Sequence, residues 1–323
     1  MADERNIEVT VTIITYMHEK YIRRCLDSVF AQKTNFAFQV VVAEDCSPDN
    51  TRSILLEYKE RYGDQLVLIL QEKNLGPGKN SRSLTPYIKG KYSASVEGDD
   101  YWTDPYKLQK QYEILEKNPQ YSGVCSDYMI VDTDNNVLRA KKLNLEKDIT
   151  KSMNDWFRDG LTLHICTNFK RTCIFPYDDK KYIDLRSSIV TMGDSVSFAL
   201  QYDYGDIYVM HEVTAAHRVA GESDTSSFGY LQKKESIKYL KIFNNNMRNL
   251  EKYFGGKYDF SPRICHRTAV VKCAHLLGQY KYKNREMLKI QKDYTWRMNV
   301  SVYYRMVKIF WGKLMRRLEK QFG

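Results

Sequence analysis

The sequence predicts an α/β protein with a mostly parallel sheet, helices on both of its faces, and a helical C-terminal extension. Two observations lead to this fold class. Within the first 100 residues, short and largely apolar runs rich in β-branched residues alternate with stretches at helical spacing, a pattern typical of parallel sheets buried on both faces. Beyond about residue 230 the spacing is helical throughout, and Lys and Arg are in excess.

Four strands are expected in the first 100 residues, and each ends in a polar segment. They are Val9–Ile14, Phe38–Ala43, Leu66–Leu70 and Tyr92–Val96. The helices between them are expected over 18–31, from 49 or 50 onward, and over 79–89, with a later helix and strands over 194–216. Parallel sheets bind ligands at the carboxyl ends of their strands, so the polar segments there are the expected site.

Charge is distributed unevenly along the 323 residues. Residues 1–230 sum to −6, whereas 231–323 sum to +16, which indicates two roles, with the basic part facing a polyanion or an anionic membrane. A loop-like stretch near 222–230 separates them. We therefore expect a catalytic α/β domain over 1–225 and a basic helical region over 226–323.

The sequence also predicts where the protein works. Its polar N-terminus leads directly into a strand, and no run of about 18 apolar residues occurs, so neither a secretory signal nor a membrane span is expected. The seven cysteines are dispersed without a C-x-x-C pair, as is usual for reduced thiols. A cytoplasmic protein is expected.

Three carboxylates follow the fourth strand in the segment Glu97-Gly98-Asp99-Asp100. Such close carboxylates repel one another unless a cation neutralises them, and Mg²⁺ or Mn²⁺ prefers carboxylate oxygens together with phosphate oxygens and water. Gly98 permits a tight turn that lets the side chains converge. The alternative is a solvated acidic turn. Neither the G-x-G-x-x-G motif nor the P-loop motif is present.

Four segments at the strand ends occur in an order that resembles a known family. They are residues 11–16, 44–51, 74–80 and 97–109, which are similar to the opening strand, the V-D-D-G-S-x-D-x-T element, the N-x-G loop and the D-x-D region of the inverting family 2 glycosyltransferases of GT-A fold. In the second segment, Glu44 and Cys46 stand where the family has Asp and Gly.

The resemblance implies a set of site residues. Those expected to bind a nucleotide-sugar donor, with UDP as its nucleotide, are Thr15, Tyr16, Glu44, Asp45, Lys79, Asp99 and Arg218. Those expected to bind Mn²⁺ or Mg²⁺ are Asp100, Glu97 and His217. The family's closing strand often reads Y-R-x-H, but here the position of its His is Ala220. Either His217 substitutes for it, or the metal relies on Asp100, phosphates and water.

An inverting transfer also needs a general base for the acceptor hydroxyl. The family carries it as an Asp that opens a helix after the acceptor-side strands, and Asp194 fits this description. A helix N-terminus would favour the ionised form of Asp194. The alternative is that Asp194 only caps the helix. The segment 163–169 is similar to the strand beneath the acceptor, where His164 and Thr167 are weaker candidates.

The C-terminal residues 299–322 place apolar and aromatic side chains at three-and-four spacing, with Lys and Arg on much of the remaining surface. This pattern is typical of a helix that lies on an anionic membrane surface. Alternatively, the apolar stripe packs on the catalytic domain. No nucleic-acid-binding motif supports a nucleic-acid partner, although the charge alone would allow one.

Together these features predict a metal-dependent inverting glycosyltransferase of the hexosyl or N-acetylhexosaminyl type, peripheral at the inner face of the plasma membrane. Its expected acceptor is a hydroxyl of a glycan or lipid-linked glycan in bacterial surface-polysaccharide synthesis. The alternative function is a non-catalytic protein of the same fold that binds sugar nucleotides.

Overall fold

Parallel strands at the centre of the molecule carry the residues expected at the site. The computed structural model describes residues 7–158, 163–189, 193–219 and 235–276. The strands in this part of the chain are β1 (Ile7–Thr15), β2 (Ala37–Glu44), β3 (Leu66–Leu70), β4 (Tyr92–Glu97), β5 (Tyr101–Trp102), β6 (Tyr121–Val131), β7 (Val137–Arg139), β8 (Ile149–Lys151), β9 (Phe169–Arg171) and β10 (Asp206–Arg218).

Helices in the described residues connect and flank these strands. They are α1 (Ile22–Phe30), α2 (Thr51–Tyr62), α3 (Pro77–Ser83), α4 (Lys107–Lys117), α5 (Met153–Arg158), α6 (Lys180–Ser188), α7 (Gly193–Tyr204), α9 (Ser236–Tyr253) and α10 (Ser261–Leu276). The α/β class and the four N-terminal strands predicted from the sequence are confirmed.

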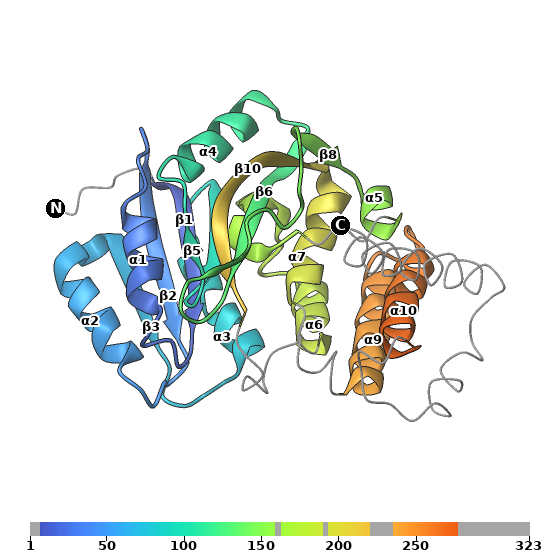
Figure 1. The fold of residues 1–323 in the computed structure, drawn as a ribbon, viewed down its shortest axis with the longest axis horizontal. Helices are drawn as coiled ribbons and strands as arrows, with labels where there is room; N and C mark the ends of the chain where they lie inside the picture. The colour runs from blue at the N-terminus through green and yellow to red at the C-terminus, as the bar shows by residue number, and fades with distance from the viewer. Residues whose placement is uncertain (1–6, 159–162, 190–192, 220–234, 277–323) are drawn as a thin grey trace, which may run out of the picture. The chain divides into compact units, whose positions relative to one another are not determined.

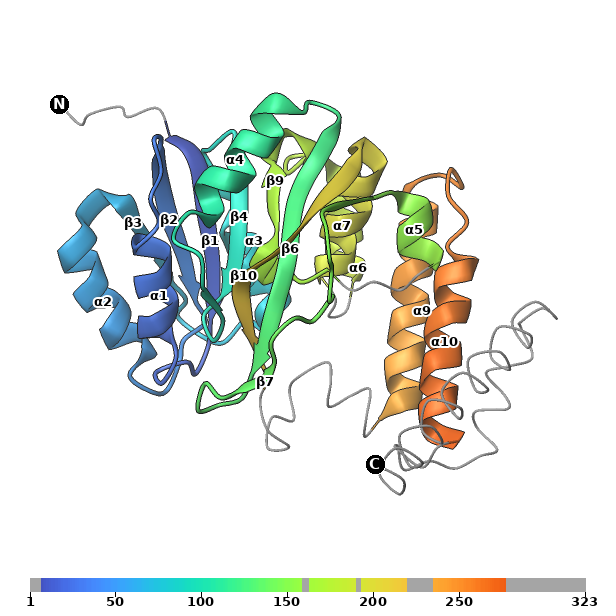
Figure 2. The ribbon, with the colours of Figure 1, turned by 45° about the horizontal axis from the view of Figure 1, so that its top comes forward.

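The sheet has the strand order β3-β2-β1-β4-β9-β6-β10-β5, with β7 beside β6 and β8 beside β10. Strands β1 to β4 are parallel, whereas β9 runs antiparallel to both β4 and β6. Apolar side chains from α1, α2 and α4 bury one face of the sheet, and α3 lies on the other face with α7 (Figures 1 and 2). This is the two-face cover that parallel strands require.

Two predicted helices differ from their expected bounds. Helix α1 begins at Ile22 rather than near residue 18, because Met17 has a left-handed backbone (φ 57°) and the Met17 and His18 amides donate to side chains of the next loop. Helix α3 ends at Ser83, since a 3-10 turn containing Pro86 follows it.

The chain divides into two compact units. The first contains residues 1–153, 161–186 and 193–221, and the second contains 154–160, 187–192 and 222–323. The second unit thus begins near the expected boundary but also takes two short segments from the expected catalytic domain.

The second unit has its own apolar core. Aromatic rings of Trp156, Phe157 and Phe260 pack edge to face, and the guanidinium of Arg263 stacks on Trp156 at 3.8 Å from the ring centre. Helices α9 and α10 were expected in this basic region and are present. The expected membrane helix at 299–322 lies outside the described residues. Within those residues, none of the helices has both the length and the apolar character needed to cross a bilayer.

Candidate active site

The strand ends bring the four sequence segments to one edge of the sheet. In the parallel register, Thr15 at the end of β1 pairs with Glu44 at the end of β2, and Ile14 pairs with Glu97 at the end of β4. Segments separated by up to about 80 residues therefore adjoin. We call residues 15–21, 44–51 and 74–76 the loop cluster. We call Glu97, Asp99, Asp100, His164, Asp194 and His217 the acidic centre.

Asp45 organises the loop cluster. Its carboxylate is buried and accepts hydrogen bonds from the backbone amides of Leu75 (2.7 Å) and Gly76 (2.9 Å), while its own amide donates to the carbonyl oxygen of Thr15 (3.1 Å). One residue thus joins the three loops that were expected to surround a nucleotide base. Its contact with that base remains a prediction.

Glu44, by contrast, faces the interior of its own turn. Its buried carboxylate pairs with Arg52 at 2.5 Å and accepts from the Ser47 amide. Between Glu44 and Ser47, Cys46 adopts a left-handed backbone (φ 58°), the conformation that favours glycine at this position. The turn therefore keeps the shape that a glycine would give it, although the residue is Cys. The expected donor contact of Glu44 remains a prediction.

Tyr16 and Lys79 are exposed at the same edge. The Tyr16 side chain is 39% exposed, and Lys79 is exposed in the first turn of α3. The Asp49 carboxylate accepts from the amide of Thr51 at the start of α2 (3.0 Å) and from the amide of Glu19 (3.2 Å). Tyr16 and Lys79 are available to a ligand, whereas Asp49 serves the backbone.

Gly98 places the loop cluster directly against the acidic centre. A Cβ atom at this position would lie 2.7 Å from Oγ1 of Thr15 and 2.8 Å from Nδ1 of His18. These two side chains are themselves 3.2 Å apart. Only glycine allows so close an approach, which explains the residue between Glu97 and Asp99.

Asp100 and His217 form the core of the acidic centre. The Asp100 carboxylate is buried, accepts from the Arg218 amide (2.8 Å), and lies 3.2 Å from Nδ1 of His217. Burial acts to raise the pKa of Asp100, but His217 outweighs it and holds that pKa below its ordinary value. Burial acts to lower the pKa of His217, yet Asp100 raises it above its ordinary value. The two groups stabilise each other's charged forms.

His164 lies beside this pair, although it was only a weaker candidate from the sequence. Its Nδ1 lies 3.8 Å from an Asp100 carboxylate oxygen, and its ring centre lies 3.9 Å from that of His217. Burial and the neighbouring His217 lower the pKa of His164 to about 3, so the ring is neutral. A histidine within the apolar run Leu163–Cys166 was the one signal for this position. That run forms a 3-10 turn at Ile165–Thr167 rather than a strand.

Glu97 and Asp99 add two further carboxyl groups to the acidic centre. Burial, reinforced by Asp99, raises the pKa of Glu97 well above its ordinary value, and burial together with Asp100 raises that of Asp99. Carboxylates this close to one another keep their protons unless a cation compensates them. The group therefore favours a bound cation.

Arg218 is buried and fully engaged with the protein. Its guanidinium donates to the carbonyl oxygens of Asp99 (2.9 Å) and Asp132 (2.6 Å) and to the side chain of Asn135 (2.7 Å), and it stacks on Tyr21. These contacts hold the acidic loop in place. The expected contact between Arg218 and the donor remains a prediction.

Asp194 lies in the first turn of α7, near the acidic centre. Its side chain is exposed, but protein atoms surround it, and the resulting desolvation raises its pKa. The cations Arg186, Lys170 and His217 partly offset this rise. A carboxylate with a raised pKa is closer to the pKa that general-base catalysis at neutral pH requires. The structure thus brings together the expected base and the expected metal ligands.

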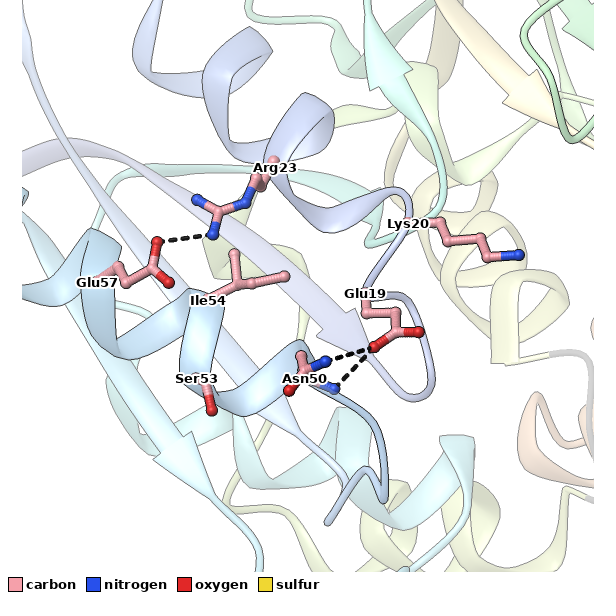
Figure 3. Close-up of a pocket in the computed structure, with 7 residues that line it drawn as sticks. All are labelled: Glu19, Lys20, Arg23, Asn50, Ser53, Ile54 and Glu57. Carbon is pink, nitrogen blue, oxygen red and sulfur yellow. Dashed lines mark hydrogen bonds and ion pairs between the residues drawn. The ribbon is translucent and has the colours of Figure 1, made fainter.

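Two overlapping groups of side chains could hold a metal ion in the described residues. One is Asp100 with His164 and His217, and the other is Asp100 with Glu97 and Asp99. Asp100 belongs to both. A polar pocket at the starts of α1 and α2 includes residues of the loop cluster, and in it Arg23 pairs with Glu57 and Glu19 accepts from Asn50 (Figure 3). No member of the acidic centre lines that pocket.

Comparisons with known proteins agree with this geometry. Glycosyl transferase family 2 matches residues 10–180 of the chain. An uncharacterized protein of Mycobacterium tuberculosis is 41% identical over 117 residues, 36% of this chain and 34% of the relative. The putative teichuronic acid biosynthesis glycosyltransferase TuaG of Bacillus subtilis is 30% identical over 112 residues, 34% of this chain and 43% of the relative.

Two solved structures share the fold. Residues 1–349 of S. aureus TarS in complex with UDP-GlcNAc superpose with a TM-score of 0.59 at 20% identity, covering 84% of this chain and 72% of that one. GalNAc-T7 with UDP, GalNAc and Mn²⁺ superposes with a TM-score of 0.51 at 12% identity, covering 71% and 48%.

The fold is therefore GT-A, as predicted. The chain spans less than half the length of the two curated relatives described above. Since the family match extends over more than half of this chain and includes the loop cluster and most of the acidic centre, the chain belongs to glycosyl transferase family 2.

Proposed function

We propose that this chain is an inverting glycosyltransferase that moves a sugar from a UDP-sugar to an acceptor hydroxyl. One observation carries the proposal: three carboxylates at the end of β4 lie with two imidazoles around Asp100, the charge of Asp194 at the start of α7 acts on Glu97 and Asp100, and the loop cluster adjoins them at Gly98. Donor site, metal ligands and base are thus within one set of loops. The family match and the fold shared with TarS support it.

The residues divide the reaction between them. The loop cluster would bind the uracil, with Tyr16 as an exposed wall and Asp45 as an acceptor of hydrogen bonds, while Asp99 of the acidic centre would accept from the ribose. Asp194 would take the proton from the acceptor hydroxyl as the new glycosidic bond forms, which requires its ionised form. Inversion is a single in-line displacement, so the leaving UDP departs on the face of the sugar opposite to this base.

The donor set fits a divalent metal. Asp100 is buried, faces the neutral imidazole of His164, and belongs to both potential ligand groups. Asp100 and His217, with Glu97 or His164, would hold Mn²⁺ or Mg²⁺. A bound metal would stabilise the negative charge that develops on the diphosphate. Imidazole nitrogen favours Mn²⁺ over Mg²⁺, which prefers oxygen ligands alone.

A panel of nucleotide sugars tests the donor. We expect a UDP-sugar to raise the melting temperature of the protein in the presence of Mn²⁺ and to release UDP when an acceptor is added. A GDP- or dTDP-sugar that does so instead would contradict the UDP assignment. Stabilisation by a nucleotide sugar without release of the nucleotide under any condition would favour the non-catalytic alternative.

We further propose that the acceptor is a glycan or lipid-linked glycan of a bacterial cell surface and that the protein works at the inner face of the plasma membrane. The similarity to TuaG, a putative teichuronic acid biosynthesis glycosyltransferase, supports the first part. The amphipathic, basic sequence of residues 299–322 supports the second. We expect the full chain to co-sediment with anionic liposomes at low salt and to be released as salt rises, because salt screens the attraction. A chain lacking 299–323 that sediments equally well would contradict this role.

A further inference from the structure

Two cations of the first unit act on the proposed base, and a third adjoins one of them. Lys170 comes from β9 and Arg186 from α6, and Arg82 from α3, more than 80 residues earlier in the chain, contacts Arg186. None of them belongs to the family segments that the sequence singled out for the donor.

The side chain of Arg186 lies at the start of α7, and Arg82 contacts the backbone of Arg186. Nη1 of Arg186 would lie 3.7 Å from a Cβ atom on Gly193, the residue before Asp194. Nη1 of Arg82 lies 3.4 Å from the carbonyl oxygen of Arg186. Both side chains are half-buried, and the pKa of Arg82 is lowered by burial and by the charge of Arg186. Two guanidinium groups therefore repel each other beside the base.

Lys170 approaches from the sheet. It is only 6% exposed, and within the described ranges its Nζ has one hydrogen-bond partner, the hydroxyl of Ser95 at 3.2 Å. Burial lowers the pKa of Lys170 to about 8, and Asp194 partly offsets this effect. An ammonium group that is nine-tenths buried and has no carboxylate within ion-pair distance is costly to keep charged.

These three cations have few carboxylate partners. Among the described residues, no ion pair joins Arg82, Lys170 or Arg186 to a carboxylate, and Asp194 is the one carboxylate whose charge acts on both Lys170 and Arg186. Arginine side chains present several donors in a planar fork that matches carboxylate and phosphate oxygens. An anionic ligand group would satisfy donors that the protein leaves open.

We propose that Arg82, Lys170 and Arg186 bind an anionic group, a phosphate or a carboxylate, that the acceptor carries next to its reacting hydroxyl. This inference rests on the proposed function, and it names the acceptor class. In an in-line displacement the leaving diphosphate and the acceptor hydroxyl lie on opposite sides of the reacting carbon. Cations grouped around the base therefore meet the acceptor, whereas Asp100 and its neighbours meet the diphosphate.

Acceptor binding tests this assignment without catalysis. The probes are fluorescein-labelled oligomers of similar length: glycerol phosphate for phosphate, galacturonate for carboxylate, and maltose units for a neutral glycan. In the presence of UDP and Mn²⁺, the wild type is expected to bind at least one anionic oligomer at least ~10-fold more tightly than the neutral one, from one to two charged hydrogen bonds. Whether it prefers the phosphate or the carboxylate oligomer identifies the source of the charge.

Variants assign the effect to residues. Arg186→Ala and Arg82→Ala are each expected to weaken anionic binding by ~10-fold and to reduce its salt dependence, while Arg186→Lys restores part of it. Lys180→Ala is the matched control, since Lys180 is an exposed cation of the same helix that pairs with Asp184, and it should change nothing. Melting temperatures exclude unfolded variants.

The affinity for UDP separates the possible outcomes. If Arg82→Ala and Arg186→Ala weaken UDP binding as much as acceptor binding, the cations serve the donor diphosphate and the inference is wrong. Equal binding of neutral and anionic oligomers by the wild type, or no binding of any of them, also overturns it. A wild type that fails to bind every nucleotide sugar would instead overturn the proposed function.

Discussion

The loop cluster and the acidic centre adjoin at Gly98 but satisfy their polar groups in different ways. In the loop cluster, Asp45 and Glu44 are buried and their carboxylate oxygens already accept hydrogen bonds from backbone amides or Arg52. In the acidic centre, Glu97 and Asp99 mainly face other carboxylates, and burial raises the pKa of each. The loop cluster has its buried carboxylates paired without a ligand, whereas the acidic centre contains neighbouring carboxyl groups that repel one another when ionised.

This difference indicates how binding energy is used. A preformed loop cluster does not have to be ordered when a nucleotide binds, so it contributes affinity. Removing the repulsion in the acidic centre requires a cation, and the proposed metal would arrive there with the diphosphate. We therefore expect substitutions in the two regions to affect different measurements.

The largest effect is expected at Asp100, which belongs to both potential metal groups. Asp100→Asn nearly preserves shape but removes the charge, so transfer should fall by at least ~10³-fold, because a metal contributes several kcal/mol to the transition state. Calorimetry should show that UDP binds with an affinity that no longer depends on Mn²⁺. Full activity of the wild type in EDTA would contradict this assignment.

The next effect is expected at Asp194. Asp194→Asn should lower turnover by ~10²–10⁴-fold while UDP affinity stays close to that of the wild type, because a general base acts mainly in the transition state. Asn is as good a helix cap as Asp. Near-normal turnover of the variant would therefore mean that Asp194 is only a cap.

The pH profile gives the same test a second readout. A raised pKa means that the wild type loses activity as pH falls through a value above the ordinary range of Asp, when the base takes up its proton. For the same reason, ionised Asp194 destabilises the folded state. Asp194→Asn should therefore raise the melting temperature at neutral pH, and this gain should disappear in acid, where Asp194 is protonated. A lower melting temperature of Asp194→Asn than of the wild type at neutral pH would contradict this prediction.

A smaller effect is expected at His164. If it supports the metal with Asp100 and His217, His164→Ala should weaken Mn²⁺ binding by ~10-fold or more, read from the electron paramagnetic resonance signal of free Mn²⁺. His211→Ala is the matched control, because His211 also pairs with a carboxylate, Asp148 at 2.5 Å, outside the acidic centre. An equal loss of Mn²⁺ affinity in both variants would show that His164 has no special role in metal binding.

The smallest effect is expected in the loop cluster. Cys46 has φ 58°, which costs most L-residues about 1–2 kcal/mol, so Cys46→Gly should stabilise the protein by up to ~1 kcal/mol after the greater flexibility of unfolded Gly is subtracted. Cys46→Ala keeps the strain and should not stabilise it. Chemical denaturation measures both, and an equal gain in the two variants would point to the thiol instead.

How far the sequence predicts this molecule depends on the range of the interactions involved. Strands such as Leu66–Leu70 were predicted at their observed bounds, because apolar runs between turns are local signals. The four family segments located both regions of the site. Helix α1 was predicted too early, because contacts with the next loop, which local spacing does not report, hold residues 17 and 18 out of the helix.

The remaining site features depend on side chains that meet only in the fold. Nothing near His164 in the chain indicates that its ring would stack beside His217, 53 residues later. Likewise, the spacing of Arg82 and Arg186 gives no sign that they adjoin. Arg218 was predicted to bind the donor because it lies in the segment similar to the family's closing strand. The sequence does not show that three protein oxygens already accept its hydrogen bonds.

The contacts of Arg218 also connect two separate loops. Its guanidinium links the Asp99 backbone to the hairpin turn at Asp132 and Asn135, two residues that are not themselves proposed to touch the donor. A change in that turn would shift the acidic loop through Arg218 without replacing a residue proposed to bind the ligand. Sequence variation at residues 132–136 is therefore a route by which turnover could be tuned, in nature or by directed evolution, while the preference for a particular nucleotide is left intact.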